Sequence, residues 1–113
     1  MAVVGQINIR NSVQRTNLKN ILGYAVKKRC GYYNELCKID ERMGDTVESI
    51  RISGFINTGH TLLDETYSIT DLGDEYYKDI FGKNSYWTKR IFGALERFKI
   101  KLLSSIGNGE RIL

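Results

Sequence analysis

The first third of the chain carries apolar residues at helical spacing. They recur at intervals of three and four positions at Leu18, Ile21, Leu22 and Ala25. This spacing predicts a first helix over about 12–29, because residues three and four apart share one face of a helix. Gly31 is expected to stop this helix, since glycine readily adopts the left-handed backbone of a helix end. Residues 3–9 alternate weakly and predict a short strand or an ordered arm.

A second apolar stripe follows at Leu36, Ile39 and Met43. It predicts a second helix that is capped by Asn34 and ends at Gly44. The next stretch, "DTVE" at 45–48, resembles a capping box, in which two side chains bind each other's backbone N–H groups. It predicts a third helix over about 45–53 that stops at Gly54. The alternative for this segment is a strand, because its apolar residues partly alternate.

Two strands and a turn are predicted next. "GFIN" at 54–57 and the segment 61–70 have the pattern of strands, and "TGH" at 58–60 is typical of a turn. Thr70 can cap a further helix that begins at Asp71, whose acidic first turn suits the positive end of the helix dipole.

The last third predicts one long amphipathic helix. Its apolar residues, again three and four apart, are Trp87, Ile91, Ala94, Leu95, Phe98 and Leu102. We expect this helix over 83–106, with residues 84–85 as its cap and a frayed tail over 107–113. An N-terminal arm over 1–11 and one small domain over 12–82 precede it.

Composition supports a single small soluble domain. The chain has 113 residues, of which 42% are hydrophobic and 27% are charged. No apolar run reaches the roughly 18 residues of a membrane span, and the start lacks the basic, then apolar, pattern of a signal peptide. We therefore expect a cytoplasmic protein with no membrane contact.

Candidate chemistry is sparse. Cys30 and Cys37 lie seven positions apart and His60 is the one histidine, so four zinc ligands at recognisable spacing are lacking. Carboxylates such as Asp40 and Glu41 are adjacent, and adjacent side chains point apart. We expect no enzyme activity, no cofactor and no metal site.

Charge is unevenly distributed, although the net charge is only +4. Residues 1–30 carry six basic side chains and no acidic one. Residues 31–72 carry eight acidic and three basic side chains, and residues 73–113 carry five acidic and eight basic ones. A polyanion such as DNA would therefore be drawn to the two ends of the chain.

Two stretches carry a resemblance to a known fold. "VESIRISGFI" at 47–56 is similar to the end of a recognition helix and its exit into the first strand of a wing. "YSITDLG" at 67–73 is similar to the element that ends the second wing strand and opens the next helix. With the two preceding helices, residues 12–82 resemble a winged helix-turn-helix domain of the MarR-like and PadR-like prokaryotic and phage regulators.

The resemblance implies a fold that is mostly α with a two- or three-stranded β wing and an additional amphipathic C-terminal helix. It also implies that the third helix enters the DNA major groove, that the wing contacts the minor groove or the backbone, and that terminal helices often build a homodimer. On this helix Glu48 makes the exposed surface acid-bearing, so we expect phosphate contacts chiefly at the basic ends.

The expected DNA-binding residues are Arg10, Arg15, Lys19, Lys27, Lys28, Arg29, Thr46, Ser49, Arg51, Asn57, Thr58, His60 and Thr61. The expected dimerisation residues are Trp87, Ile91, Leu95, Phe98 and Leu102. Two alternatives stand beside these sets. The basic side chains can be solvated surface groups, and the C-terminal helix can cover the core of its own monomer.

The sequence thus favours a small dimeric protein that binds double-stranded DNA, either a transcriptional repressor or a plasmid or phage partition or replication factor. The alternative is a winged-helix protein–protein interaction module, such as a phage-encoded inhibitor or adaptor. In that case the acidic region of the third helix would face a basic protein partner.

Overall fold

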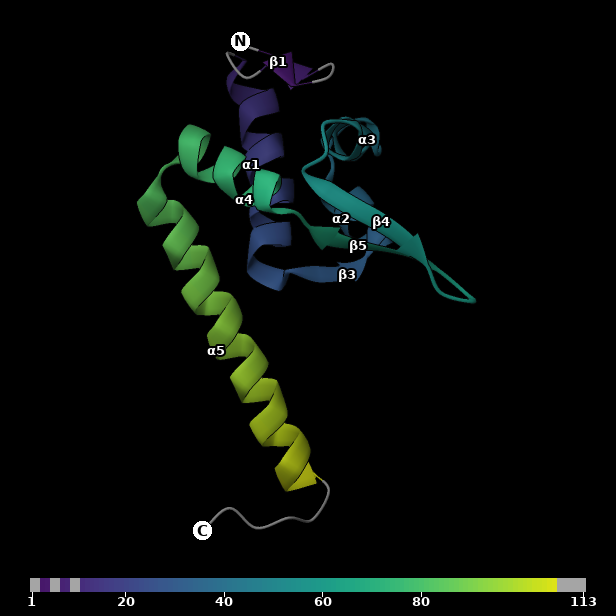
Figure 1. Ribbon diagram of the computed structural model, residues 1–113, viewed down its shortest axis with the longest axis vertical. Coiled ribbons are helices and arrows are strands. Elements are labelled where there is room, and N and C mark those ends of the chain that lie inside the picture. The colour runs from purple at the N-terminus through teal and green to yellow at the C-terminus, as the bar shows by residue number, and fades with distance from the viewer. Residues whose placement is uncertain (1–2, 5–6, 9–10, 108–113) are drawn as a thin grey trace.

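The computed structural model describes residues 3–4, 7–8 and 11–107, with side chains for residues 11–101. Most of the described chain is helical, with α1 at Ser12–Lys28, α2 at Tyr33–Ile39, α3 at Asp45–Ile52, α4 at Asp71–Phe81 and α5 at Lys83–Gly107. The strands are β1 at Val3–Val4, β2 at Ile7–Asn8, β3 at Cys30–Tyr32, β4 at Ile56–His60 and β5 at Glu65–Ile69. Where a strand or arm was predicted, β1 and β2 form a short antiparallel pair (Figure 1).

A small antiparallel sheet has the strand order β3-β5-β4. Its central residue Tyr67 lies opposite Gly31 on one side and Thr58 on the other. The prediction of a mostly helical chain with a two- or three-stranded sheet is therefore confirmed. The short strand β3 was not predicted, because its three residues show no alternation of apolar and polar positions.

The first helix ends in a way that the sequence did not predict. Arg29, not Gly31, has the positive φ of 70°, and its N–H donates to the Ala25 carbonyl at 2.8 Å. Gly31 instead lies inside β3. A non-glycine residue at positive φ is uncommon. The Arg29 guanidinium is held by two hydrogen bonds to Asp74, at 2.7 and 2.8 Å, which fix the chain at this corner.

The second helix is shorter than predicted. Asn34 does not cap it; the N–H of Tyr32 donates to the Glu35 carboxylate at 3.1 Å. The helix ends before Asp40, which is buried, so Met43 lies beyond it and is 96% exposed. The prediction of an apolar stripe that reaches Met43 is wrong. The helix ends at Ile39, and the carboxylate of Asp40 then lies in the interior of the domain.

The prediction of a third helix over 45–53 is confirmed, and the strand alternative is wrong. The expected capping box is not formed; instead the carboxylate of Asp40 accepts a hydrogen bond from the N–H of Val47 at 3.0 Å. Gly54 follows the helix with a φ of 81°, as expected of a glycine at a helix end.

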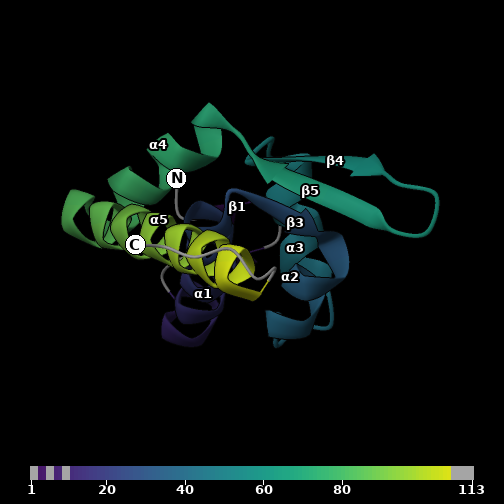
Figure 2. The same cartoon turned by 90° about the horizontal axis from the view of Figure 1, so that it is seen from below.

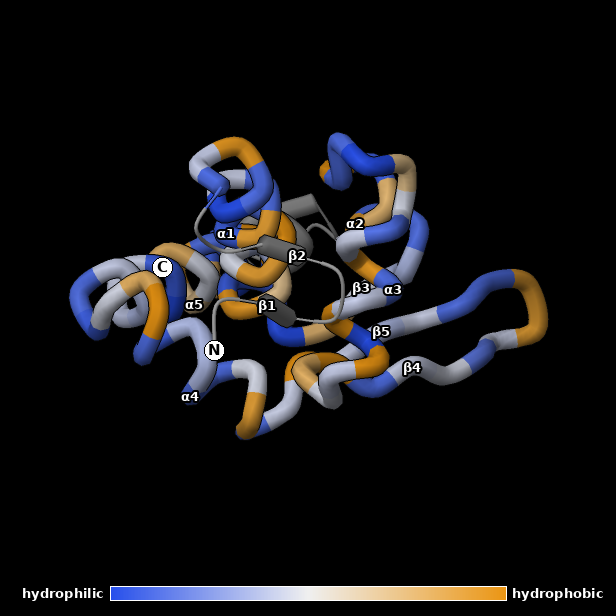
Figure 3. The backbone as a smooth tube through the Cα atoms, turned by 90° about the horizontal axis from the view of Figure 1, so that it is seen from above, coloured by the Kyte–Doolittle hydropathy of each residue, from blue (hydrophilic) through white to orange (hydrophobic). Residues whose placement is uncertain are grey.

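The hairpin of β4 and β5 turns later than predicted. Residues 58–60 belong to β4, so the expected turn at "TGH" is wrong. The turn is formed by residues 61–64, and the hairpin projects from the body (Figure 3). After β5, Thr70 caps α4 as predicted, since its Oγ1 accepts from the Gly73 N–H at 3.0 Å. A Cβ on Gly73 would lie 2.3 Å from the Phe55 carbonyl oxygen, so only glycine fits there.

The core is built around α1, which contacts α2, α3, α4, α5 and β5 (Figures 1 and 2). The fully buried side chains that fill it are Leu18, Ile21, Leu22, Val26, Leu36, Val47, Ile50 and Tyr77. Leu18, Ile21 and Leu22 belong to the face of α1 that the helical spacing predicted, and Val26 adds to it. Burial of these apolar side chains is the main force that holds the small domain together.

The last helix begins at Lys83 and continues beyond the body of the domain (Figure 1). It crosses α1 closely, because a Cβ on Gly93 would lie 2.1 Å from the Lys27 carbonyl oxygen. The Cα radius of gyration is 15.8 Å, against roughly 13 Å for a compact chain of this length. The difference is consistent with a last helix that extends beyond the body of the domain.

Candidate functional site

The surface of α3 offers fewer polar contacts than the sequence predicted. Thr46 and Ser49 are buried. The hydroxyl of Thr46 accepts from Asn17 Nδ2 at 3.0 Å, and that of Ser49 donates to the Asp45 carbonyl at 3.1 Å. Arg51 is the predicted DNA-binding residue of α3 that reaches solvent. The helix α3 is therefore rotated so that Thr46 and Ser49 are buried and form hydrogen bonds within the protein instead of facing solvent.

Arg51 is paired on the surface of its own helix. Its guanidinium donates two hydrogen bonds to Glu48, one of them from Nε at 3.1 Å. The Tyr33 hydroxyl also donates to Glu48, at 3.2 Å. These hydrogen bonds hold the pKa of Glu48 below its usual range, and the bond from Arg51 has the larger effect. At neutral pH the exposed edge of α3 thus carries a compensated pair of charges.

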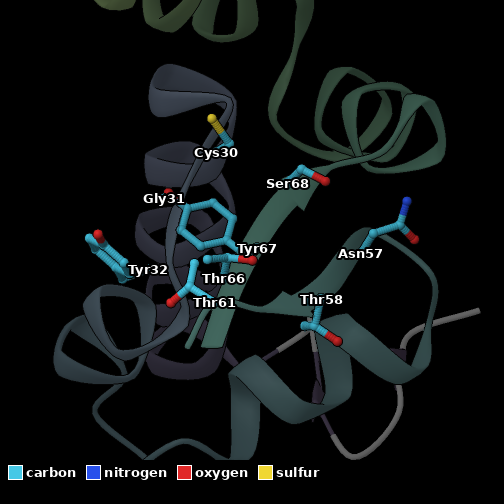
Figure 4. Close-up of a pocket in the computed structure, with 10 residues that line it drawn as sticks. Cys30, Gly31, Tyr32, Asn57, Thr58, Thr61, Thr66, Tyr67 and Ser68 are labelled. Carbon is cyan, nitrogen blue, oxygen red and sulfur yellow. The ribbon is translucent and has the colours of Figure 1, made fainter. Parts of the chain in front are cut away.

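The outer face of the sheet forms a shallow hollow of about 580 Å³ (Figure 4). Three predicted DNA-binding residues, Asn57, Thr58 and Thr61, lie in its lining. The remaining lining residues are Cys30, Gly31, Tyr32, Gly59, Thr66, Tyr67 and Ser68. Among these described residues none carries a charged side chain, so the hollow offers hydroxyl, amide and thiol groups. His60 is exposed at the end of β4, outside the lining.

The basic residues at the end of α1 are engaged within the protein. Lys27 and Lys28 share the carboxylate of Glu96 on α5, at 2.7 and 3.3 Å. Arg97 donates to the Lys27 carbonyl at 2.9 Å. Arg29 holds the buried Asp74, as described above. The junction of α1 and α5 keeps an excess of positive charge, but Arg29 has a structural role.

The basic residues of the first half of α1 lie elsewhere. Arg15 stacks over the ring of Phe81, with its guanidinium carbon 5.3 Å from the ring centroid, and donates to the Ile80 carbonyl at 2.9 Å. Lys19 approaches the same ring, at 6.0 Å. Arg10 lies outside the described residues. The predicted DNA-binding residues therefore fall into separate groups on α1, α3 and the hairpin, and the structure does not bring them to one surface.

The predicted dimerisation residues form an exposed stripe on α5. Trp87, Ile91, Leu95 and Phe98 are between 52% and 66% exposed, and the side chain of Leu102 lies outside the described residues. The stripe occupies the side of the helix opposite Gly93, which faces α1. The other side of α5 covers the core of its own chain by packing against α1 and α4, and the exposed stripe does not take part in this contact.

Two exposed leucines were missed by the sequence reasoning. Leu62 and Leu63 are 104% and 91% exposed at the turn of the β4–β5 hairpin. Sequence analysis assigned them to a strand, where alternate residues are buried. The turn chemistry of Thr61 and Asp64 around them is the signal that could have identified them.

Comparisons with known proteins give no family assignment. No protein-family model, curated protein or solved structure was found to match the chain. Within the part of the chain that the structure describes, no helix combines the length and apolar character that crossing a membrane requires. The same residues contain no cluster of three or more histidine, cysteine, aspartate or glutamate side chains able to hold a metal ion.

Proposed function

We propose that the chain is a winged helix-turn-helix protein that binds double-stranded DNA as a homodimer. The observation that carries the proposal is the order of elements. Three helices, α1 to α3, lead into an antiparallel hairpin, and the hairpin ends at the Thr70 cap of a further helix. In a domain of this kind the last of the three helices and the hairpin face the duplex.

Readout in this proposal depends on the exposed edge of α3 and on the strand β4. Arg51 can donate to guanine O6 and N7 or to a phosphate once it leaves Glu48. Asn57 and Thr58 are exposed on β4 and can bind the backbone or base edges. Lys27 and Lys28 add long-range attraction, because together they outnumber the single carboxylate of Glu96.

The dimer in this proposal forms through the exposed stripe of α5. An apolar stripe with two aromatic and two branched aliphatic residues costs free energy when it faces water. Pairing with the same stripe of a second copy buries both, as in a two-fold symmetric interface. The two DNA-binding surfaces would then meet half-sites about one helical turn apart.

The test is an electrophoretic shift assay with random and upstream-region DNA at two salt concentrations. A dimer that makes about six phosphate contacts loses roughly a thousandfold in affinity between 50 and 200 mM salt. Arg51→Ala and the pair Lys27→Ala/Lys28→Ala should each weaken binding about tenfold or more. Lys83→Ala is the matched control, since it removes one exposed positive charge at the start of α5.

A further variant uses the pairing of Arg51. Glu48→Gln removes the carboxylate that competes with phosphate for the guanidinium, so binding should strengthen severalfold. Arg29 is left unchanged in all variants, because its loss would expose the buried Asp74. If the parent protein binds no DNA at low salt, the proposal is wrong.

The second candidate function is a protein–protein interaction module on the same fold. The observation that favours it is the compensated, acid-bearing edge of α3, on which Ile52 is 70% exposed beside Glu48 and Arg51. A basic partner with an apolar contact would fit this edge. Absence of DNA binding at low salt would favour this candidate over the first.

A further inference from the structure

The turn of the β4–β5 hairpin presents two leucines to solvent. Leu62 and Leu63 are 104% and 91% exposed, and Figure 3 shows the hydrophobic colour at the far end of the hairpin. Turns usually carry glycine, proline, asparagine, aspartate or serine, each for its backbone geometry. Two adjacent leucines at such a place bury little apolar surface in their own chain and are available for contact with another molecule.

The turn is held in one shape by the backbone and the hydroxyl of Thr61. The N–H of Thr61 donates to the Asp64 carbonyl at 2.8 Å. The hydroxyl of Thr61 donates to that carbonyl at 3.1 Å and accepts from the N–H groups of Leu63 and Asp64, at 3.4 and 3.0 Å. These bonds restrict the backbone that carries the leucines. A contact made by a turn that is already ordered has less conformational entropy to lose.

A groove of about 360 Å³ lies beside this turn. Its lining residues are Tyr33, Asn34 and Cys37 of α2 and Leu63, Asp64 and Glu65 of the hairpin. Burial raises the pKa of the Cys37 thiol, and so do the nearby carboxylates of Asp40, Glu65 and Glu48. Asp64 and Glu65 bring two exposed carboxylates to the groove, whereas Glu48 on α3 is paired with Arg51.

We propose that Leu62 and Leu63, with the groove beside them, form a docking site for a basic, apolar segment of a partner protein. The leucines supply apolar contact, and Asp64 and Glu65 select lysine or arginine around it. Asp64 and Glu65 would repel phosphates, so this end of the hairpin lies outside the DNA contact proposed above, which uses Asn57 and Thr58 of β4. The inference rests on this turn and groove alone and holds whether or not the chain binds DNA.

The test uses the full-length protein and two short synthetic amphipathic peptides of identical pattern. One is built of leucine and lysine, the other of leucine and glutamate. Binding is followed by the NMR methyl signals of Leu62 and Leu63 and by titration for affinity. The leucine–lysine peptide should shift these signals, and the leucine–glutamate peptide should leave them in place.

Variants separate this site from the other apolar surfaces. Leu62→Ser/Leu63→Ser and Asp64→Asn/Glu65→Gln should each weaken binding of the leucine–lysine peptide about tenfold or more. Val13→Ser/Leu72→Ser is the matched control, since it removes two aliphatic side chains that are 64% and 55% exposed elsewhere. All variants should keep the parent's thermal stability, because the substituted leucines touch solvent and the Asp64 backbone bonds remain.

Several results would overturn the proposal. They are equal binding of both peptides, signal changes confined to α5, or an unchanged affinity of the Leu62→Ser/Leu63→Ser variant. A change in oligomeric state in that variant would make a second copy the occupant instead. If the parent protein binds zwitterionic lipid vesicles and the Leu62→Ser/Leu63→Ser variant does not, the occupant is a membrane surface. DNA binding by the same variant reports separately on the proposed function.

Discussion

At the residue scale, the buried carboxylate of Asp40 organises the loop between α2 and α3. It accepts hydrogen bonds from Asn17 Nδ2 at 2.9 Å and from the N–H groups of Arg42 and Val47 at 2.7 and 3.0 Å. Burial works against the charged form. These hydrogen bonds together outweigh burial and hold the pKa of Asp40 below its usual range.

This carboxylate should make the protein acid-sensitive. A carboxyl whose pKa is lower in the folded state contributes stability above its unfolded pKa, about 4, and loses it as pH falls through the folded value. Asp40→Asn should cost about 1–3 kcal/mol at neutral pH and flatten the loss of stability below about pH 4. Urea unfolding at several pH values measures both. An Asp40→Asn variant with the parent's pH dependence would contradict the assignment.

A second residue-scale prediction concerns Tyr24 and Glu35, which form a hydrogen bond across the α1–α2 corner. The hydrogen bond to Glu35 has the largest effect and burial the next largest, and together they raise the pKa of Tyr24 to about 12. The same hydrogen bond lowers the pKa of Glu35, and the hydrogen bond from the N–H of Tyr32 lowers it further. The stability from Tyr24 is therefore present below about pH 10, the unfolded value, and is lost as pH rises through about 12.

Tyr24→Phe should raise the pKa of Glu35 toward its ordinary value, about 4.3. An NMR titration of the Glu35 carboxyl carbon measures the change. Tyr32→Phe is the control, because it removes a hydroxyl from a neighbouring exposed ring and keeps the backbone N–H that binds Glu35. Equal titration curves for the parent and Tyr24→Phe would show that the hydrogen bond does not form in solution.

At the element scale, α1 and α5 cross at two glycines, Gly23 and Gly93, which differ in the atoms that an added Cβ would meet. A Cβ on Gly93 would meet the Lys27 carbonyl oxygen at 2.1 Å, a backbone atom that cannot move alone. A Cβ on Gly23 would meet the flexible end of Lys89 at 3.3 Å and the Tyr77 ring at 3.4 Å. Gly93→Ala should destabilise the protein by about 1–3 kcal/mol. Gly23→Ala, the control in the partner helix, should cost much less in the same thermal unfolding measurement.

The elements that sequence patterns could predict are those whose signal is local. The helices α1 and α5 follow from apolar spacing, and α4 follows from its cap Thr70 and its acidic first turn. The helix α3 was predicted correctly, but from a capping box that does not form. The range of α1 was predicted closely, but its ending at Arg29 and the position of α2 could not be predicted, because they depend on contacts between distant residues. Arg29 binds Asp74 from 45 positions away, and Asn17 binds Asp40 from 23 positions away.

The candidate site shows the same limit. The apolar stripe of α5 was predicted, because its spacing lies within one helix. Local sequence patterns could not predict the pairing of Lys28 with Glu96, which lies 68 positions away. The basic residues 27–29 were therefore expected to be available for DNA, although they are engaged within the protein. The rotation of α3, which buries Thr46 and Ser49, depends on Asn17 and Asp40 and was equally hidden.

At the scale of the whole molecule, the projecting α5 carries the apolar stripe that the proposed dimer would bury. The helix leaves Trp87, Ile91, Leu95 and Phe98 between 52% and 66% exposed and extends past the body of the domain (Figure 1). A two-fold contact would bury the stripe of each copy, and each large apolar side chain contributes about 1.5–3 kcal/mol when it is fully buried. We therefore expect the parent protein to be a dimer at micromolar concentration.

Leu95→Glu/Phe98→Glu should convert the dimer to a monomer, because each copy would bring two charges into the apolar contact. The dimer dissociation constant should rise at least about a hundredfold in analytical ultracentrifugation. Val13→Glu/Leu72→Glu adds the same charges at exposed apolar positions away from α5 and should leave the dimer intact. A parent protein that sediments as a monomer, or a Leu95→Glu/Phe98→Glu variant that remains dimeric, would assign the stripe to a different partner. In the proposed function the monomeric variant should also bind DNA more weakly, since two half-sites are no longer held together.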